Sequence, residues 1–425
     1  MASSYSTNPT LNGARAQLRA LDEGVPQALS GFRPSASLSA DASIAKARSS
    51  LSPSWSKTFY PRGFSFTIQQ PIFRGFRTKN TVKMAHTSVL AGREQLRSAE
   101  QDVLLSTVQA FMDVVLAQVV LNLRAQNITF LTEQVRAAQD RLTVGEGTRT
   151  DLAQAQASLS AGQSSYAAAV ADLNQSIAVY IQVVGHRPTQ LGAADGVERL
   201  LPKSLDGGLG IALAAHPDIL AASYNVDIAA YNVKIAEGAL LPSIALEGDY
   251  SHRDDASALG DWSDSASVSA KLSMPLYQAG QPSSEVRQLK ETLGQQRIAL
   301  DSARGAVRQG FVSAWAMLEA TTAQVAAAAS QVAADQLALA GVLEERKVGQ
   351  RTTLDVLNAQ QDLLNARVSQ VTAQHDRVIA AYQVMSAMGK LDAKTLGLAV
   401  SIYDPTEHYN AVKDKWFGLR TPDGR

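Results

Sequence analysis

The sequence predicts a mixed α and β protein built from two copies of one structural repeat. The chain has 425 residues, which exceeds one ordinary domain and indicates either two domains or one elongated assembly. Its two halves resemble each other, and each carries strand-like alternation followed by long stretches with helical spacing. The repeat, and not the whole chain, is therefore the unit whose elements need an explanation.

Two ungapped self-matches reveal the repeat. Residues 5–41 match residues 213–249, and the block from Val144 to Gly185 matches the block from Val348 to Gly389, in the same order along the chain. Two long matches in one order are not expected by chance. We therefore expect a first repeat over residues 1–185, a linker over 186–211, a second repeat over 212–390 and a C-terminal tail over 391–425.

Alternation of apolar and polar residues predicts four strands. In the first repeat, Phe64, Phe66 and Ile68 are separated by single polar residues, and the other segments show the same period of two. Such alternation is typical of strands with one apolar and one polar face. The strands are expected at about 34–48, 62–74, 242–252 and 264–277, paired as two hairpins.

Long helices are expected after each hairpin. No Pro occurs from Thr78 to Arg141, and a second helical seam runs from Thr148 to Val184. Apolar residues recur at heptad-like spacing, and small ones alternate with large ones, so neighbouring helices can approach closely. A helix of about 60 residues extends ~90 Å, which is too long for a compact globule. On the helices alone, a soluble coiled-coil scaffold in the periplasm or cytosol stays open as an alternative.

The strands favour a membrane location. We expect no membrane-spanning helix, since no stretch approaches the 18 consecutive apolar residues that one needs. Four strands are too few to close a membrane barrel, which needs about eight, and the bilayer does not tolerate an open sheet with unpaired edges. Closure therefore requires several chains. The loops between the strands carry aromatic residues that suit an interfacial girdle, although each one singly also suits loop packing: Trp55, Phe59, Tyr60 and Trp262.

Composition excludes several kinds of site. The chain has no Cys, which removes disulfides, thiol nucleophiles and Cys-bound zinc, and its 39 basic and 39 acidic residues give no overall case for binding nucleic acid. The six His show no ligand spacing, and no nucleophile elbow or Walker lysine is present. We therefore expect no enzyme, no catalytic residue, no metal, no cofactor and no nucleic-acid partner.

The N-terminal sequence has no signal-peptide pattern. Met1-Ala2-Ser3-Ser4 leads into polar sequence without a basic start and an apolar stretch. We expect either a cytosolic protein or a mature form with an added Met.

Several motifs together resemble the TolC family of outer-membrane efflux and secretion channel proteins. These are the Pro-Ser starts of two strands, the endings Gln70-Pro71-Ile72-Phe73 and Met274-Pro275-Leu276-Tyr277, and the turns Val-Gly-x-x-Thr-x-x-Asp at 144–151 and 348–355. The ending Tyr403-Asp404-Pro405 with Trp416 looks most like alphaproteobacterial members.

The resemblance implies a homotrimer in the outer membrane of a Gram-negative bacterium. Its 12-stranded transmembrane β-barrel, in contact with lipid, would continue into a long 12-helix periplasmic α-barrel. The function implied is a passive exit duct of a tripartite efflux pump or a type I secretion system. Its partners would be a periplasmic adaptor protein and an inner-membrane transporter of the RND or ABC type.

The two turns between long helices are the first candidate site. The resemblance implies that adaptor proteins dock there through residues of the two repeats, whereas the turn chemistry alone equally suits a plain helical hairpin. The residues concerned are Val144, Gly145 and Thr148, and Val348, Gly349 and Thr352.

Two carboxylates follow these turns. Asp151 and Asp355 fit capping boxes, and in a trimer each would also form a ring of three that favours cations in a narrow pore. The resemblance places selectivity acids at Asp355 and three residues later, where this chain has Asn358, so a double acid ring is reduced to one. By the same resemblance, Arg346 stands at a position that is often Tyr in enterobacterial relatives. Arg351 matches a basic position of the family and is either a gating salt-bridge residue or a solvated charge, and the resemblance implies a gate that opens by an iris-like untwisting of the inner helices.

Overall fold

The computed structural model describes residues 1–49, 52–189, 197–255 and 260–424. The described residues form two compact units: one comprises residues 1–15, 94–220 and 302–403, and the other comprises residues 16–93, 221–301 and 404–425. The helices are α1 (Ala2–Thr7), α2 (Pro9–Asp22), α3 (Gly24–Ser30), α4 (Arg77–Thr143), α5 (Arg149–Val184), the 3-10 helix η1 (Val197–Leu200), α6 (Leu205–Ala215), α7 (Pro217–Gly238), α8 (Gln281–Lys347), α9 (Thr353–Ala387) and α10 (Glu407–Val412). The strands are β1 (Ser35–Ala42), β2 (Ala45–Ser49), β3 (Ser52–Phe59), β4 (Arg62–Arg74), β5 (Ser243–Asp254) and β6 (Trp262–Ser273).

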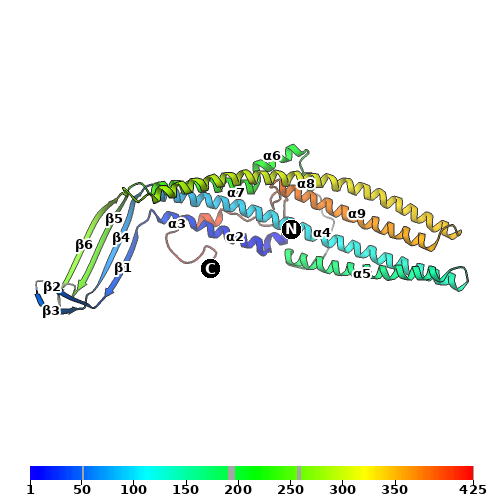
Figure 1. Ribbon diagram of the computed structural model, residues 1–425, viewed down its shortest axis with the longest axis horizontal. Helices are drawn as coiled ribbons and strands as arrows, with labels where there is room; N and C mark the ends of the chain where they lie inside the picture. The colour runs from blue at the N-terminus through cyan, green and yellow to red at the C-terminus, as the bar shows by residue number, and fades with distance from the viewer. Residues whose placement is uncertain (50–51, 190–196, 256–259, 425) are drawn as a thin grey trace. The chain divides into compact units, whose positions relative to one another are not determined.

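Strands from both repeats form one antiparallel sheet. Its order is β1-β4-β5-β6, so the two predicted hairpins are present and are joined to each other by the pairing of β4 with β5. Figure 1 shows these four strands side by side. The strands β4, β5 and β6 have 12 or 13 residues each, enough to cross a bilayer, for which about 9–11 tilted residues suffice.

The sheet has one apolar face, and that face is exposed. The register aligns Leu38 with Phe66, Phe66 with Tyr250, and Tyr250 with Ala266 across all four strands. Val268, on the same face, is 80% exposed. An apolar surface of this extent on a soluble monomer is unusual and marks contact with lipid or a partner.

The first predicted strand, over residues 34–48, is interrupted. β1 ends at Ala42, and the chain then enters a separate two-stranded sheet in which β2 pairs with β3. We expected a polar loop between the first two strands. This extra hairpin has no alternation of large apolar residues, because its sequence is dominated by Ser, Lys and Ala, so periodicity gave no sign of it.

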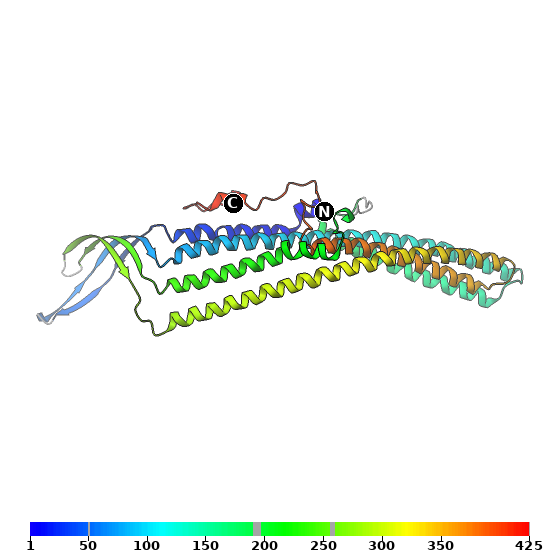
Figure 2. The same cartoon turned by 90° about the horizontal axis from the view of Figure 1, so that it is seen from above.

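The long helices confirm the predicted seams. The helices α4 and α8 have 67 residues each, which corresponds to ~100 Å, and α5 and α9 return antiparallel to them after short turns. Figure 2 shows the two helical hairpins, α4–α5 and α8–α9, lying next to each other. They are in contact through α5 and α9.

By length and composition alone, α4, α5 and α8 are apolar enough to cross a membrane, among the described helices. Runs of consecutive apolar residues did not show this, because single polar residues interrupt the apolar windows of these helices. These helices carry little charge along their Ala-rich seams, and small residues of the seam such as Ala155 are buried against neighbouring helices.

Part of the segment between the repeats is helical, and residues 190–196 of it lie outside the described residues. The predicted linker over 186–211 contains η1 and the start of α6, although Gly207, Gly208 and Gly210 disfavour a helix there. Ser204 caps α6 by accepting a hydrogen bond from the Gly207 N–H at 3.3 Å. Gly208 allows Phe311 to pack closely, because a Cβ at position 208 would lie 2.3 Å from the Phe311 ring.

The last part of the C-terminal tail, from residue 404 onward, belongs to the unit that contains the sheet. His408 of α10 is hydrogen-bonded to the buried Asp22 carboxylate at 3.0 Å, and Tyr409 to His86 of α4 at 2.8 Å. Burial raises the pKa of the Asp22 carboxyl, and His408 opposes this effect. Polar contacts with α2 and α4 therefore hold the tail in place.

Candidate functional site

The first tip, residues 144–148, is the tight turn that connects α4 to α5. Gly145 has φ +80°, a conformation that favours glycine, and the N–H groups of Glu146 and Gly147 donate to the Arg141 carbonyl. Thr148 then caps α5 in a capping box with Asp151. Val144, at the summit, is 71% exposed.

The second tip, residues 348–352, has the same geometry and connects α8 to α9. Gly349 has φ +78°, and the Gln350 N–H donates to the Glu345 carbonyl at 3.0 Å. Thr352 forms a capping box with Asp355, and Val348 is as exposed as its counterpart in the first repeat. The sequence repeat therefore reproduces the same backbone turn twice.

The Asp355 carboxylate serves the helix cap and carries charge at the same time. The backbone N–H and hydroxyl of Thr352 both donate to it at 2.8 Å, and together with the nearby Arg351 they lower the pKa of Asp355 below its ordinary value. Asp151 occupies the equivalent cap, and Asn358 lies exposed further along α9. Each tip is thus followed by one capping carboxylate, which lies on the first turn of the next helix.

The two basic residues beside the second tip have different partners. Arg351 pairs with Glu345 of its own turn at 2.7 Å, and Glu345 raises the pKa of Arg351. Arg346 instead donates to the Gln134 side chain of α4 at 2.6 Å. Burial and the nearby Arg141 lower the pKa of Arg346. Arg346 therefore joins the two helical hairpins, whereas Arg351 stabilises a single turn.

Further contacts join the hairpins above the tips, and the sequence analysis did not identify them. The Gln360 amide of α9 donates to the buried Asn127 of α4 at 3.0 Å. Leu357 of α9 packs with Leu131 and Ala155 of the first hairpin. The missed signal was the polar pair Asn127 and Gln134, which interrupts an apolar seam at heptad spacing.

A His–Asp contact joins α4 and α9 within the same unit. His375 of α9 is largely buried and lies 2.9 Å from the Asp113 carboxylate of α4 and 2.8 Å from Asp376. The sequence analysis found no ligand spacing among the six His. Among the residues that the structure describes, no group of three His, Asp or Glu has the geometry to hold a metal ion.

The polar face of the sheet is a second candidate surface. Cross-strand hydrogen bonds cover it: Ser39 with Ser65 at 2.7 Å, Thr67 with Asp249 at 2.8 Å, and Gln69 with Glu247 at 3.1 Å. These bonds give the polar side chains hydrogen-bond partners although the face is not buried. Such a polar, exposed face suits a surface that lines an aqueous lumen.

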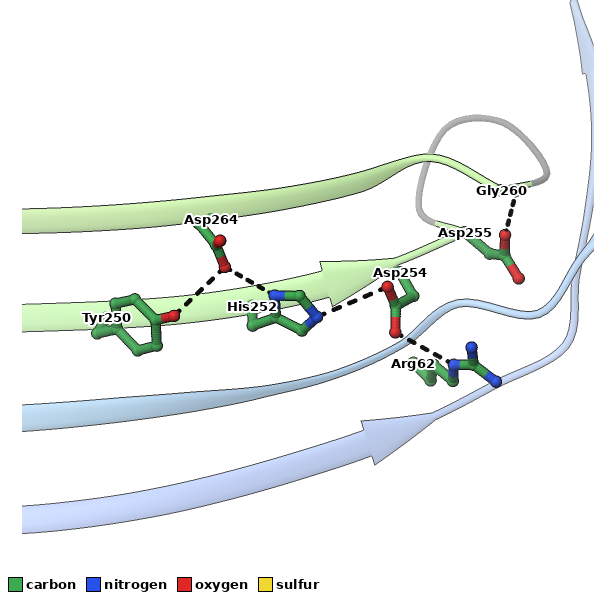
Figure 3. Close-up of polar contacts among 7 residues, drawn as sticks. All are labelled: Arg62, Tyr250, His252, Asp254, Asp255, Gly260 and Asp264. Carbon is green, nitrogen blue, oxygen red and sulfur yellow. Dashed lines mark hydrogen bonds and ion pairs between the residues drawn. The ribbon is translucent and has the colours of Figure 1, made fainter.

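The apolar face ends in a polar network near the loop between β5 and β6. Figure 3 shows Tyr250 and His252 pointing toward Asp264, with the His252 ring 2.7 Å from the carboxylate. Asp254 lies next to His252 and pairs with Arg62 at 3.3 Å. The change from apolar to charged residues in successive rows marks one boundary of the apolar band.

Two of the predicted aromatic residues lie near this boundary. Trp262 begins β6, opposite Asp254, and is 68% exposed, and Tyr60 precedes β4 and is also exposed. Trp55 and Phe59 belong to β3, but their side chains lie outside the described residues.

Comparison with known proteins identifies the family. The family model described as "Outer membrane efflux protein" matches residues 3–186 and 208–390. The chain belongs to the outer membrane efflux protein family. Its location is therefore the outer membrane of a Gram-negative bacterium, with a periplasmic helical portion, and its function is that of an outer-membrane exit duct, as the sequence analysis predicts.

Named relatives support the same assignment. This efflux protein is 47% identical to the outer membrane efflux protein BepC of Brucella suis biovar 1, over 100% of this chain and 92% of BepC. It is 26% identical to the alkaline protease secretion protein AprF of Pseudomonas aeruginosa, over 79% of this chain and 71% of AprF. The solved Campylobacter jejuni CmeC outer membrane channel shares its fold, with a TM-score of 0.81, 16% identity, and coverage of 97% of this chain and 88% of CmeC.

Proposed function

We propose that three copies of this efflux protein close a 12-stranded transmembrane β-barrel. The observation that carries this proposal is the sheet itself: β1 and β6 are edge strands, and the apolar face is exposed. Unpaired strand edges are not tolerated in lipid, and four strands from each of three chains give an even-numbered barrel of sufficient size. Tyr60 and Trp262, with Trp55 and Phe59, would form its aromatic girdle.

The helices of the three copies would form a 12-helix periplasmic tunnel. Four helical segments per chain, from α4, α5, α8 and α9, supply the twelve, and the tunnel would be continuous with the barrel. The organisation into repeats over 1–185 and 212–390 is supported by the two matched family segments and by the equal lengths of α4 and α8.

Adaptor docking at the tips is supported by their exposure and repetition. The exposed Val144 and Val348 stand next to left-handed glycines, each followed by a rigid cap. A surface repeated twice per chain offers six similar sites in a trimer, which suits multivalent docking of a periplasmic adaptor. An inner-membrane transporter of the RND or ABC type would complete the assembly. The names of BepC and AprF support efflux and protein secretion, respectively.

The gate would be formed near Asp355 by the hairpin of α8 and α9, which would be the inner one of the tunnel, with the hairpin of α4 and α5 outside it. Three Asp355 carboxylates in a ring would favour cations, with Asp151 on the outer hairpin and the neutral Asn358 in the position of a second ring. Arg346, with its bond to Gln134, would hold the inner hairpin to the outer one until adaptor contact untwists it. The duct would be passive and not an enzyme, and its partners would supply energy.

Reconstitution into planar lipid bilayers tests the proposed function. The purified full-length protein should give uniform conductance steps, and Asp355→Asn should lower the preference for cations. The exposed Asp140 of α4, which precedes the other tip, provides a matched control as Asp140→Asn. A protein that stays soluble without detergent and gives no conductance steps would overturn the proposal.

A further inference from the structure

A hollow lies at the helix-proximal end of the sheet, on its polar face. Its volume is about 480 Å³. Its walls come from the ends of β1, β4, β5 and β6 and from the segments that connect the sheet to α3 and α4. Because Ser35, Gln69 and Lys271 alternate with the apolar residues of their strands, the hollow opens on the face opposite the apolar band.

The hollow carries a strong excess of positive charge. Arg33, Arg74, Arg77 and Lys271 line it, and the acidic residue among the lining residues is Glu247. Glu247 accepts a hydrogen bond from Gln69. Within the described part of the chain, Arg74, Arg77 and Lys271 have no carboxylate within ion-pair distance. Like charges gathered without counter-charges repel one another, so the arrangement gains from a bound anion.

Two of these basic side chains flank a strained turn. Gly75 and Phe76, between Arg74 and Arg77, have φ values of +59° and +61°, and the latter is unusual for a bulky residue. Gly75 is fixed against α7, since a Cβ there would lie 2.1 Å from the Gly238 carbonyl oxygen. Strain of this kind persists where the surroundings impose it and is common at ligand sites.

The third guanidinium group is held by the C-terminal tail. Arg33 stacks over the Trp416 ring at 4.5 Å and donates to the Lys415 carbonyl oxygen at 2.8 Å. Neither contact neutralises its charge. The tail therefore orients Arg33 while leaving the positive charge of the hollow intact.

We propose that Arg33, Arg74, Arg77 and Lys271 form a binding site for phosphate or carboxylate groups. Planar guanidinium groups match these anions with paired hydrogen bonds. The assignment to cargo rests on the proposed function, in which the polar face lines the lumen: there the site would hold anionic groups of a substrate as it enters the barrel. A lipid headgroup phosphate is the other source of the same chemistry, and the side of the sheet favours the soluble anion.

Calorimetry with inorganic pyrophosphate tests the site on the detergent-solubilised full-length protein at low salt. We expect saturable binding that weakens at least about tenfold in the double variant Arg74→Gln/Lys271→Gln. Arg253→Gln is the matched control, because Arg253 lies on the same face but is paired with Asp41, and it should leave the affinity unchanged. Equal affinities of the wild-type protein and the double variant, or no binding at low salt, would overturn the site.

A competition experiment distinguishes the two sources of phosphate, the soluble anion and the lipid headgroup. Short-chain phosphatidylglycerol, added at the same phosphate concentration, should fail to displace pyrophosphate. Displacement would overturn the assignment to cargo. The variants should retain the far-UV circular dichroism and heat-modifiable oligomer of the wild type, and Arg74→Lys/Lys271→Arg should keep pyrophosphate binding within about threefold of the wild type.

Bilayer recordings distinguish this proposal from the proposed function. If the channel conducts normally but pyrophosphate neither binds nor reduces the current, the anion site fails and the duct stands. If pyrophosphate binds but no conductance is seen, the duct fails and the site stands. We expect pyrophosphate to reduce the wild-type current and to have at least about tenfold less potency on the double variant.

Discussion

Arg346 of α8 donates a hydrogen bond to Gln134 of α4 across 2.6 Å. The two residues are far apart in sequence and belong to different helical hairpins. Gln134 is buried, so its side-chain oxygen has little access to water if Arg346 is lost. A buried acceptor left without a donor costs about 1–3 kcal/mol, which makes this contact a stronger tie than an exposed ion pair.

Replacing Arg346 with Met should loosen the tips. We expect Arg346→Met to lower the midpoint of thermal unfolding and to raise single-channel conductance, since the inner hairpin loses its bond to the outer one. The control is Lys347→Met, because Lys347 makes only an exposed pair with Glu344. Equal conductance and equal stability of the two variants would show that Arg346 does not hold the gate.

The charge of Asp355 should survive mild acid. Its pKa is depressed in the folded state by Thr352 and, to a lesser extent, by Arg351. A carboxyl with a depressed pKa stabilises the fold above the unfolded pKa of about 3.9, and this contribution is lost as pH falls through the folded value. Cation preference should therefore persist at pH 4. In Thr352→Val it should decline at higher pH than in the wild type; identical pH profiles would contradict the assignment.

The two faces of β6 should respond differently to charge. Val268 lies on the exposed apolar face and Ser267 on the polar face. Arg on a lipid-facing strand costs about 2–4 kcal/mol at the midplane of the bilayer, whereas lumen positions tolerate it. Val268→Arg should reduce the amount of folded protein in the outer membrane, and Ser267→Arg should not. Heat-modifiability on gels measures both, and equal losses would place lipid on neither face.

Periodicity predicted the regular parts of the fold well. The alternation around Phe66 and the Pro-free stretch after Thr78 correspond to β4 and α4, because patterns of two and of seven report which side chains are buried or exposed along one face. The turns between the long helices could also be predicted, since the capping boxes of Thr148 and Thr352 are formed by residues close in sequence.

Features that depend on distant residues could not be read from the pattern. Gly208 is helical because Phe311 packs on it, and propensity alone favours a loop there. The basic hollow requires the register of four strands and the docking of the tail on Arg33. Arg346 was a candidate from the sequence, but its contact with Gln134 could not be predicted, because it depends on how the two hairpins pack against each other.

Closure by three copies is tested most directly by disulfide crosslinking between edge strands. The chain has no Cys, so Ser37→Cys in β1 can be combined in turn with Cys at Ser265, Ser267 or Ser269 of β6. Cys residues form a bridge when their Cα atoms lie within about 7 Å. We predict that one combination, oxidised in membranes, gives covalent dimers and then trimers on reducing-agent-free gels, with no larger species. No crosslinking in any combination, or a ladder that ends at the dimer or continues beyond the trimer, would contradict a trimeric barrel.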